Sequence, residues 1–275
     1  MNNSRPSPLA SDSQRNPGQI TSFQQEVSRL LTENNQKLEA NHALLENINE
    51  NVKFANTDQF NMVKVGILGS GEVGNALSKA FLKHGYQVTI GSDHPEKIAE
   101  LKKENPRLEA SSFNLCARTA DIVILCVKGT AAEKVVREVK AELPGKIVID
   151  ATNPIADAPP QNGILKFFTS LEESLMERLQ NIAPDAYFVK AFNSIGNALM
   201  DNPDFGGLKP TMFICGNNDS AKKKVSEFLQ NDLGFEVEDM GMAEGARAIE
   251  PLAILWCIPG FLRNEWTHAF KLLKK

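Results

Sequence analysis

The feature that most constrains this chain is an alternation of short apolar runs with helix-like stretches, which begins at Met62. The runs occupy residues 63–69, 86–91, 121–127, 146–152, 187–192, 211–216 and 235–240, and helix-like patterns fill about 72–84, 95–104, 131–142, 171–182, 220–231 and 243–258. Several runs are apolar throughout, as strands buried on both faces of a parallel sheet must be. The alternation predicts an α/β protein built from βαβ units, with a Rossmann-type, doubly wound, mostly parallel sheet.

A glycine-rich turn lies between the first run and the first helix. It reads Gly69-Ser70-Gly71-Glu72-Val73-Gly74, which is the G-x-G-x-x-G spacing. The first glycine permits a tight turn, the second lets the backbone approach a diphosphate, and the third lets the helix pack closely on the strand. The start of the helix also offers free N–H groups to an anion. We therefore predict that residues 69–74 bind a dinucleotide, and the alternative is an ordinary glycine-rich turn of an α/β protein.

Ser92 and Asp93 follow the second predicted strand, where a dinucleotide fold contacts the adenosine ribose. A carboxylate at Asp93 would accept hydrogen bonds from a free 2′-hydroxyl and repel a 2′-phosphate, which favours NAD. Ser92, His94 and Lys97 would instead suit a 2′-phosphate, so the sequence leaves NADP and NAD open. A second interpretation is that Ser92 and Asp93 form a turn and cap the helix that Pro95 begins.

Residues 1–61 form a polar extension that is partly helical by pattern and rich in Asn, Gln and Ser. Between residues 19 and 53, one seam recurs at spacings of four and three. The seam contains Val27, Leu31, Asn34, Leu38, Asn41, Leu45, Ile48 and Val52. It predicts a coiled-coil arm that supports a homodimer, or a lone helix or tail, or an extension ahead of a natural start at Met62. We expect residues 62–200 to form the dinucleotide-binding domain and 201–275 a C-terminal α/β subdomain packed on it.

Charge and composition narrow the expected partners to small molecules. The chain has 30 basic and 34 acidic side chains, a net charge of −4 that gives no footprint for nucleic acid or anionic lipid. No apolar run reaches the roughly eighteen residues of a membrane span, and the polar start lacks the apolar region of an export signal. We therefore expect a cytoplasmic protein without a membrane span. The four cysteines and four histidines are scattered without ligand spacing, which predicts no metal site and reduced thiols.

Five segments carry a family resemblance. They are GILGSGEVGNALSKAFLKHGYQVTIGS, DIVILCVKG, IDATNPI, VKAFNSIGN and GARAIEPLAILW, in this order over about residues 62–260. In order and spacing they resemble the coenzyme F420-dependent NADP oxidoreductase family, and they are similar to the cytosolic NADPH-binding domain of the six-transmembrane metalloreductases. The resemblance implies NADP as cofactor and a deazaflavin (coenzyme F420) or flavin as second substrate. It carries no expectation of membrane iron reduction, and Asp93 stands where the family usually has Arg.

The resemblance also implies which residues border the nicotinamide. Val127 and Lys128 end the run 121–127 and pass near the cofactor, Asn153 follows the run 146–152, and Asn193 lies in the family's Ala-Phe-Asn segment. From the residues alone, Asn153 before a proline is equally typical of a plain Asx turn.

Other conspicuous residues receive structural interpretations. We expect Lys190 to be ion-paired rather than a proton donor, and Arg247 to pair with Glu250 on one helix face, although Arg247 could instead hold an acidic part of a substrate. Pro251 predicts a kink in that helix. Three aromatic residues spaced five apart, Trp256, Phe261 and Trp266, predict packing or a dimer contact. No residue is assigned as catalytic, because hydride transfer between two aligned rings needs no acid or base.

Two functions follow from these patterns. The first is an NAD(P)-dependent oxidoreductase that transfers hydride between nicotinamide and a flavin-like, deazaflavin-like or small organic acceptor. The second is a non-catalytic NAD(P)-binding protein that senses redox state, with the N-terminal helix as its interaction arm. The fold alone gives no preference between them.

Overall fold

The computed structural model describes residues 26, 28–32, 34–39, 41 and 63–275. The described residues between 26 and 41 are helical and exposed, and they include Leu31 and Leu38 of the predicted seam. The other apolar seam residues lie outside the described residues, and they are Val27, Leu45, Ile48 and Val52. The chain divides into the compact units Met1–Thr57 and Asp58–Lys275. A role of the first unit in self-association stays a prediction.

A six-stranded parallel sheet forms the centre of the second unit, and the predicted Rossmann-type fold is confirmed. In sheet order the strands are β3 (Glu109–Ser111), β2 (Gln87–Gly91), β1 (Lys64–Leu68), β4 (Ile122–Leu125), β5 (Ile147–Asp150) and β6 (Tyr187–Lys190). Val65 of β1 pairs with Val88 on one side and with Ile122 on the other. Strand order therefore reverses between β1 and β4, and ligands of such sheets bind at the carboxyl ends of the strands at this point.

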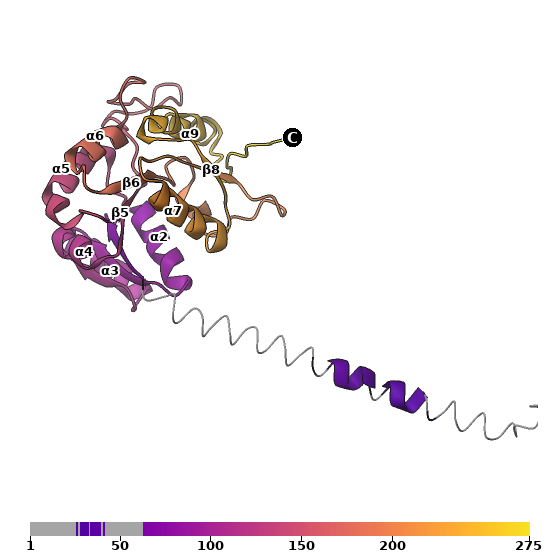
Figure 1. The fold of residues 1–275 in the computed structure, drawn as a ribbon. Coiled ribbons are helices and arrows are strands. Elements are labelled where there is room, and N and C mark those ends of the chain that lie inside the picture. Colours follow the sequence, from indigo (N-terminus) through magenta and orange to yellow (C-terminus); the bar gives the residue numbers. More distant parts are fainter. Residues whose placement is uncertain (1–25, 27, 33, 40, 42–62) are drawn as a thin grey trace, which may run out of the picture. The chain divides into compact units, whose positions relative to one another are not determined.

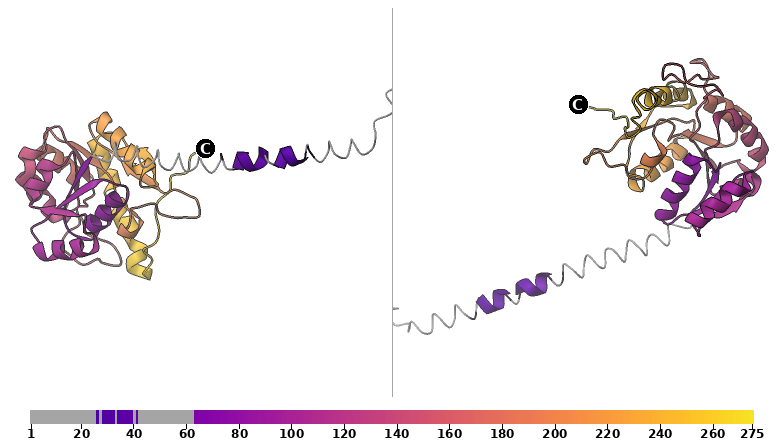
Figure 2. Two further views of the ribbon diagram at one scale, coloured as in Figure 1. Left: turned by 90° about the horizontal axis from the view of Figure 1, so that it is seen from below. Right: turned by 180° about the vertical axis from the view of Figure 1, so that it is seen from behind.

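Helices cover both faces of the sheet (Figure 1). In chain order they are α2 (Glu72–Lys83), α3 (Pro95–Glu104), α4 (Phe113–Thr119), α5 (Gly129–Val139), α6 (Leu175–Ile182) and α7 (Asp219–Asn231), with short 3-10 turns η1 (Lys140–Glu142) and η2 (Asn197–Leu199). Helices α4, α5 and α6 pack side by side on one face, and α2 and α7 lie on the other, as the views from below and behind also show (Figure 2). The sheet is therefore the middle of three layers.

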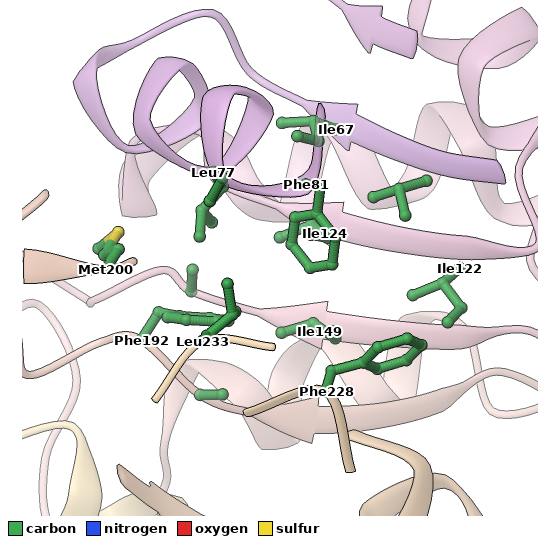
Figure 3. Close-up of a cluster of buried hydrophobic side chains, with 14 of the residues drawn as sticks. Ile67, Leu77, Phe81, Ile122, Ile124, Ile149, Phe192, Met200, Phe228 and Leu233 are labelled. Carbon is green, nitrogen blue, oxygen red and sulfur yellow. The ribbon is translucent and has the colours of Figure 1, made fainter. Parts of the chain in front are cut away.

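The core on the α2 side joins distant parts of the chain. Ile67 and Ile124 of the sheet, Leu77 of α2 and Phe228 of α7 belong to one buried cluster, and Figure 3 shows their side chains facing a common space. Phe192, just beyond β6, lies in the same cluster. Burial of this apolar surface holds the C-terminal part of the chain against the dinucleotide fold.

The C-terminal segment adds a second, two-stranded parallel sheet. Its strands are β7 (Thr211–Ile214) and β8 (Glu236–Asp239), followed by η3 (Ala243–Gly245), α8 (Ala246–Ile249) and α9 (Leu252–Arg263). An antiparallel bridge between Lys190 and Cys215 connects this sheet to the end of β6. The boundary at residue 200 stays a prediction, since the segments on its two sides share the core described above.

The sequence patterns do not predict two of the elements, β3 and α4. Strand β3 has three residues at the sheet edge, and α4 has seven residues that begin after the cap Ser112, so neither is long enough to produce a clear period. The helix expected from residue 171 begins at Leu175, because Ser174 and Glu177 form a capping box there.

One helical stretch, Ala243–Arg263, is a candidate membrane span by length and composition, with 28% of its window buried. The sequence shows no uninterrupted apolar run there because Glu250 and other polar residues lie within it. The stretch is broken where the proline predicts a kink: α8 ends at Ile249, and α9 begins after Pro251. Glu250, at the break, is 1% exposed. The cellular location stays a prediction.

Candidate functional site

The glycine-rich turn joins β1 to α2 at the switch point, and two of its glycines are required by packing. Gly69 has φ +124°, and a Cβ added to it would lie 2.9 Å from the backbone of Cys126. A Cβ on Gly74 would overlap the carbonyl oxygen of Gly69. The fold therefore accounts for both residues without any ligand.

Gly71 differs from the other glycines of residues 63–275. A Cβ added there meets nothing within 4 Å, and its backbone has φ −78° and ψ −173°, which any residue adopts. Every other glycine of this segment either has neighbours within that distance or a positive φ. Gly71 is also the N-cap of α2 and supplies no side-chain cap, so the first amides of the helix have no side-chain acceptor. The turn leaves room where a diphosphate would bind.

The end of β2 reaches the same turn. Ser70 Oγ and Ser92 Oγ lie 2.7 Å apart, and the His94 N–H donates to Ser92 Oγ at 3.1 Å. The Asp93 side chain is 68% exposed and does not cap α3. The N-cap residue of α3 is His94, and no side chain caps the helix with a hydrogen bond. The turn expected at Ser92 and Asp93 is present, and the helix cap is not. The Asp93 carboxylate lies 3.5 Å from His94 Nε2 and is otherwise exposed, so it can face a ribose or repel a phosphate.

A cleft of about 560 Å³ opens at the carboxyl ends of β4 and β5. Its lining comprises Val73, Cys126, Val127, Lys128, Gly129, Ala151, Thr152, Asn153, Ile155, Ala156, Asp157, Ala158 and Pro159. The turns after β4 and β5 touch, since a Cβ on Gly129 would overlap the carbonyl oxygen of Asn153. Lys128 Nζ lies 3.6 Å from Asp157, and both side chains are largely exposed. The cleft thus brings together Val127, Lys128 and Asn153 with Val73 of the glycine-rich turn.

Asn153 and Asn193 hold the ends of β5 and β6 together. The Asn153 side-chain amide donates to the carbonyl oxygen of Asn193 at 2.7 Å, and the side chain forms no hydrogen bond within its own turn. Asn193 Nδ2 donates to the Ile249 carbonyl oxygen at 2.9 Å and to Asn153 Oδ1 at 3.3 Å. The plain Asx turn is therefore not what the Asn153 side chain forms, and Asn193 sits behind the cleft wall rather than on it.

Lys190 lies between two carboxylates and is fully buried. Its Nζ is 2.8 Å from Asp150 and 2.9 Å from Glu250, and it donates to the Thr152 carbonyl oxygen at 2.7 Å. Burial alone would lower the pKa of Lys190, but the carboxylates of Asp150 and Glu250 outweigh it and raise the pKa overall. The ion-paired interpretation of Lys190 is confirmed.

Glu250 also caps a helix. Its two carboxylate oxygens accept bonds from the backbone N–H groups of Leu175 and Met176, each at 3.0 Å, at the start of α6. Sequence patterns do not predict this network of Lys190, Asp150 and Glu250. An aspartate closing an apolar strand and a lysine closing another at the same sheet edge were the available signal, because buried charges need partners.

The prediction that Arg247 pairs with Glu250 is wrong. Arg247 binds Glu177 through two nitrogens, with Nη2 2.6 Å from Oε1 and Nε 2.9 Å from Oε2. The Arg247 hydrogen bonds are the main cause that lowers the pKa of Glu177 to about 2. Glu250 follows the four-residue helix α8 and turns inward to Lys190 instead. The Arg247 guanidinium, the alternative site for an acidic part of a substrate, is bound to Glu177.

The C-terminal aromatic residues pack on one another, as expected. The Trp256 and Trp266 rings are 5.7 Å apart, and those of Phe261 and Trp266 are 5.3 Å apart. Trp256 Nε1 donates to the His268 carbonyl oxygen at 2.8 Å. Their packing fixes the segment after α9 on that helix.

The Cys126 thiol, at the floor of the cleft, is a poor nucleophile. Cys126 lines the cleft, and burial is the main cause that raises its pKa far above the ordinary value. Burial likewise raises the pKa of Cys116 to about 12. Both stay protonated at neutral pH, and a thiol is a poor nucleophile compared with a thiolate.

Comparisons with known proteins agree with this geometry. Residues 64–154 match the family described as NADP oxidoreductase, coenzyme F420-dependent. Metalloreductase STEAP3 of Rattus norvegicus is 32% identical over 204 residues, which cover 72% of this chain and 39% of that protein. The F420-dependent NADP reductase of Methanocaldococcus jannaschii is 28% identical over 204 residues, covering 70% of this chain and 90% of the reductase. This chain therefore spans well under half the length of the metalloreductase.

A solved structure extends the likeness to the fold. The protein from Arthrobacter sp. FB24 proposed to be an F420-dependent NADP reductase has a TM-score of 0.72 and 26% identity, covering 78% of this chain and 100% of that one. The reductive aminase of Aspergillus terreus, at 16% identity and a TM-score of 0.54, shares the fold. The resemblance found in the sequence is confirmed: residues 64–154 match the model of the coenzyme F420-dependent NADP oxidoreductases, and the chain is similar to F420-dependent NADP reductases in sequence and fold.

Proposed function

We propose that this chain is an NAD(P)-dependent oxidoreductase that transfers hydride between nicotinamide and a flavin-like, deazaflavin-like or small organic acceptor. The observation that carries the proposal is Gly71, where the fold accepts a side chain and the residue is nevertheless glycine. A ligand that approaches the backbone explains this choice, and the open amides at the start of α2 suit a diphosphate. The reductase names of the relatives support the same activity.

The proposed cofactor site runs along the strand ends. Residues 69–74 would hold the diphosphate, Ser92 and Asp93 would contact the adenosine ribose, and the nicotinamide end would lie in the cleft. The residues assigned to that end are Val127, Lys128, Asn153 and Asn193. The reduced cofactor supplies a hydride when bound, and the part of the chain described here would contribute binding, ring alignment and exclusion of water.

The cleft offers space for a second ring. It shares the lining residues Gly129, Ala156 and Asp157 with a cavity of about 630 Å³, so the two cavities lie next to each other. Pockets of roughly 300–1,000 Å³ hold drug-sized ligands. A flavin- or deazaflavin-sized acceptor beside the nicotinamide therefore fits the available volume.

The titratable groups among the described cleft residues also suit ring-to-ring transfer. They are Cys126, Lys128 and Asp157. Cys126 is protonated and buried, and the other two are exposed and pair with each other. The buried Cys126 keeps its proton, and Lys128 and Asp157 are solvated, so none of the three is both enclosed and ready to exchange a proton as a general acid or base would be. Hydride transfer between two aligned rings needs neither.

Oxidation of NADH and NADPH, followed at 340 nm with a panel of flavins, the deazaflavin F420 and quinones, tests the proposal. We expect turnover with at least one planar acceptor, and none with Gly71 replaced by valine. Tight cofactor binding without turnover on any acceptor would favour the redox-sensing alternative. Failure to bind either dinucleotide would contradict both. A cytoplasmic location and a homodimer belong to the same proposal.

A further inference from the structure

Helix α9 is strongly apolar, yet little of it is buried. Within its twelve residues, Ala253 and Gly260 alone are fully covered by the part of the chain that the structure describes. Five large apolar side chains on and beside the helix are between 37% and 56% exposed, and we call them the α9 face. They are Leu255, Phe261 and Leu262 of α9, Trp266 just after it, and Ile164 of a hairpin that packs on it.

The part of the α9 face that comes from the helix is continuous. Leu255 and Leu262 are seven positions apart, so they lie on the same side of α9 about two turns from each other. Phe261 is adjacent to Leu262 in the chain, and its ring packs edge-on against Trp266 with 5.3 Å between the centroids. The exposed side chains therefore form one surface rather than scattered points.

The hairpin extends this surface to the cleft. Its arms meet through the antiparallel bridge of Ile155 with Phe167. A Cβ on Gly163, at its turn, would lie 3.0 Å from Leu262 Cγ, so Ile164 lies beside α9. The first residues of the same hairpin, 156–159, line the cleft. The α9 face thus adjoins the candidate site.

The exposed apolar area is what a stable dimer needs. A large apolar side chain presents roughly 150–250 Å² when fully exposed, so the five exposed fractions leave about 350–600 Å² of apolar surface in water. Each partner in a standard interface contributes about 800 Å², of which roughly 56–65% is apolar. The α9 face therefore matches the apolar part of one such interface, and a contiguous apolar patch of this size marks an interaction site.

The charges around the α9 face favour a second copy of the chain over an anionic membrane. Arg263 is the only charged residue of α9, and it pairs with Glu265 at 2.8 Å. Lys271 and Lys274 of the C-terminal tail pair with glutamates of β8. An anionic lipid surface therefore finds few free cations here, although such cations are what holds interfacial helices to it. Two identical apolar faces meet without repulsion between like charges.

We infer that the α9 face binds the α9 face of a second copy of the chain in a two-fold symmetric contact, so that the same residues are used on both sides. Phe261 and Trp266 lie at its centre, since aromatic side chains are enriched in the core of interfaces. The inference rests on the proposed function in one respect, because it gives the proposed homodimer its contact surface. It is independent of hydride transfer.

Tryptophan fluorescence reports on this face, because the two tryptophans of the chain are Trp256 and Trp266. We expect sedimentation of the full 275-residue chain, at about 10 nM to 100 µM protein, to show a dimer that dissociates on dilution. Over the same range the tryptophan emission should shift to longer wavelength with the same midpoint, since dissociation exposes Trp266 to water.

A charge on the face should prevent association. Leu255→Glu should raise the Kd of the dimer at least about a hundredfold, because each dimer would bury two unpaired carboxylates. Leu115→Glu is the matched control: Leu115 is 48% exposed and lies on α4, away from α9 (Figures 1 and 2), so the dimer should persist. Both substitutions replace exposed helical residues, and Tm should stay within about 2 °C of the unchanged protein.

Each result decides the inference. A dimer that dissociates without a change in tryptophan emission would overturn it, whether or not a variant folds, and so would an unchanged Kd in Leu255→Glu. A chain that is monomeric throughout would overturn it together with the homodimer and leave hydride transfer untouched. A monomer whose emission shifts to shorter wavelength on vesicles of anionic phospholipid would assign the face to a membrane and overturn it too. Absence of turnover in a protein that dimerises through α9 would contradict the proposed activity alone.

Discussion

Replacing Gly71 by valine separates the requirements of folding from those of binding. The residue's backbone, at φ −78° and ψ −173°, is open to any side chain, and an added Cβ meets nothing within 4 Å. Valine stabilises by roughly 0.4–1 kcal/mol through the unfolded chain, and loss of glycine at the N-cap costs about 1 kcal/mol. These effects nearly cancel, so the free energy of unfolding should change by less than about 1 kcal/mol. At roughly 2–4 °C per kcal/mol, Tm should move by less than about 4 °C.

Binding should respond quite differently. The valine methyl groups would fill the space that the diphosphate needs, and its bonds to the first amides of α2 would be lost. Loss of two or three charge-assisted hydrogen bonds, each worth about 1.5–3 kcal/mol, predicts at least a hundredfold rise in the Kd for NADH and NADPH. Calorimetric titration measures the Kd, and differential scanning calorimetry measures Tm on the same samples.

Gly74→Ala is the contrasting variant. Its Cβ would overlap the carbonyl oxygen of Gly69, so we expect loss of stability together with loss of binding. A Gly71→Val protein with an unchanged Tm and an unchanged Kd would refute the assignment of this turn to a diphosphate. The argument would also fail if Gly71→Val lowered Tm as much as Gly74→Ala, since glycine would then be needed for folding.

Three further results are expected. Lys190→Met leaves the carboxylates of Asp150 and Glu250 buried without a cation, so it should lower the free energy of unfolding by about 3–5 kcal/mol. Calorimetry should then show a fall in Tm of roughly 6–20 °C, and a shift under about 2 °C would contradict the network. Asp93→Arg should improve the Kd for NADPH relative to NADH by about tenfold or more in titrations, and a preference of the unchanged protein for NADPH would show that our electrostatic argument at Asp93 is wrong. The folded-state pKa of Glu177, about 2, lies below its unfolded value, so its stabilisation is present above about pH 4.5 and is lost as pH falls toward 2. Removing its partner by Arg247→Met should therefore lower the free energy of unfolding in urea at pH 7 and lower it clearly less at pH 2.5. Equal losses at both pH values would contradict this assignment.

The sequence predicts the fold well because its strands are long enough and apolar enough to signal themselves. Ile122–Leu125 is buried at every position, which explains a continuous apolar run. By contrast, β3 is a three-residue edge strand, and its weak pattern carries little information. Patterns along the chain predict elements, and short edge elements depend on their neighbours rather than on their own period.

The same distinction, between local patterns and tertiary packing, decides which parts of the candidate site the sequence predicts. Residues 69–74 could be assigned because the whole motif lies within six consecutive positions, and local spacing carries its meaning. The partners of Arg247 and Glu250 could not be predicted, because tertiary packing selects each of them. Glu177 lies 70 positions from Arg247, and Lys190 comes from β6. Helical spacing allowed the two residues to pair, and the break after α8 turned Glu250 toward the buried lysine instead.

The buried charges also connect the C-terminal helices to the cleft. Glu250 joins the break between α8 and α9 to Lys190 at the end of β6, and Ile249, its neighbour, holds Asn193. Lys190 in turn holds the carbonyl of Thr152, which lines the cleft. A movement of α9 would therefore be transmitted to both strand ends through bonds that are expensive to break in a dry interior. Under the proposed function, a contact made on α9 would in this way reach the end of the cleft where we place the nicotinamide.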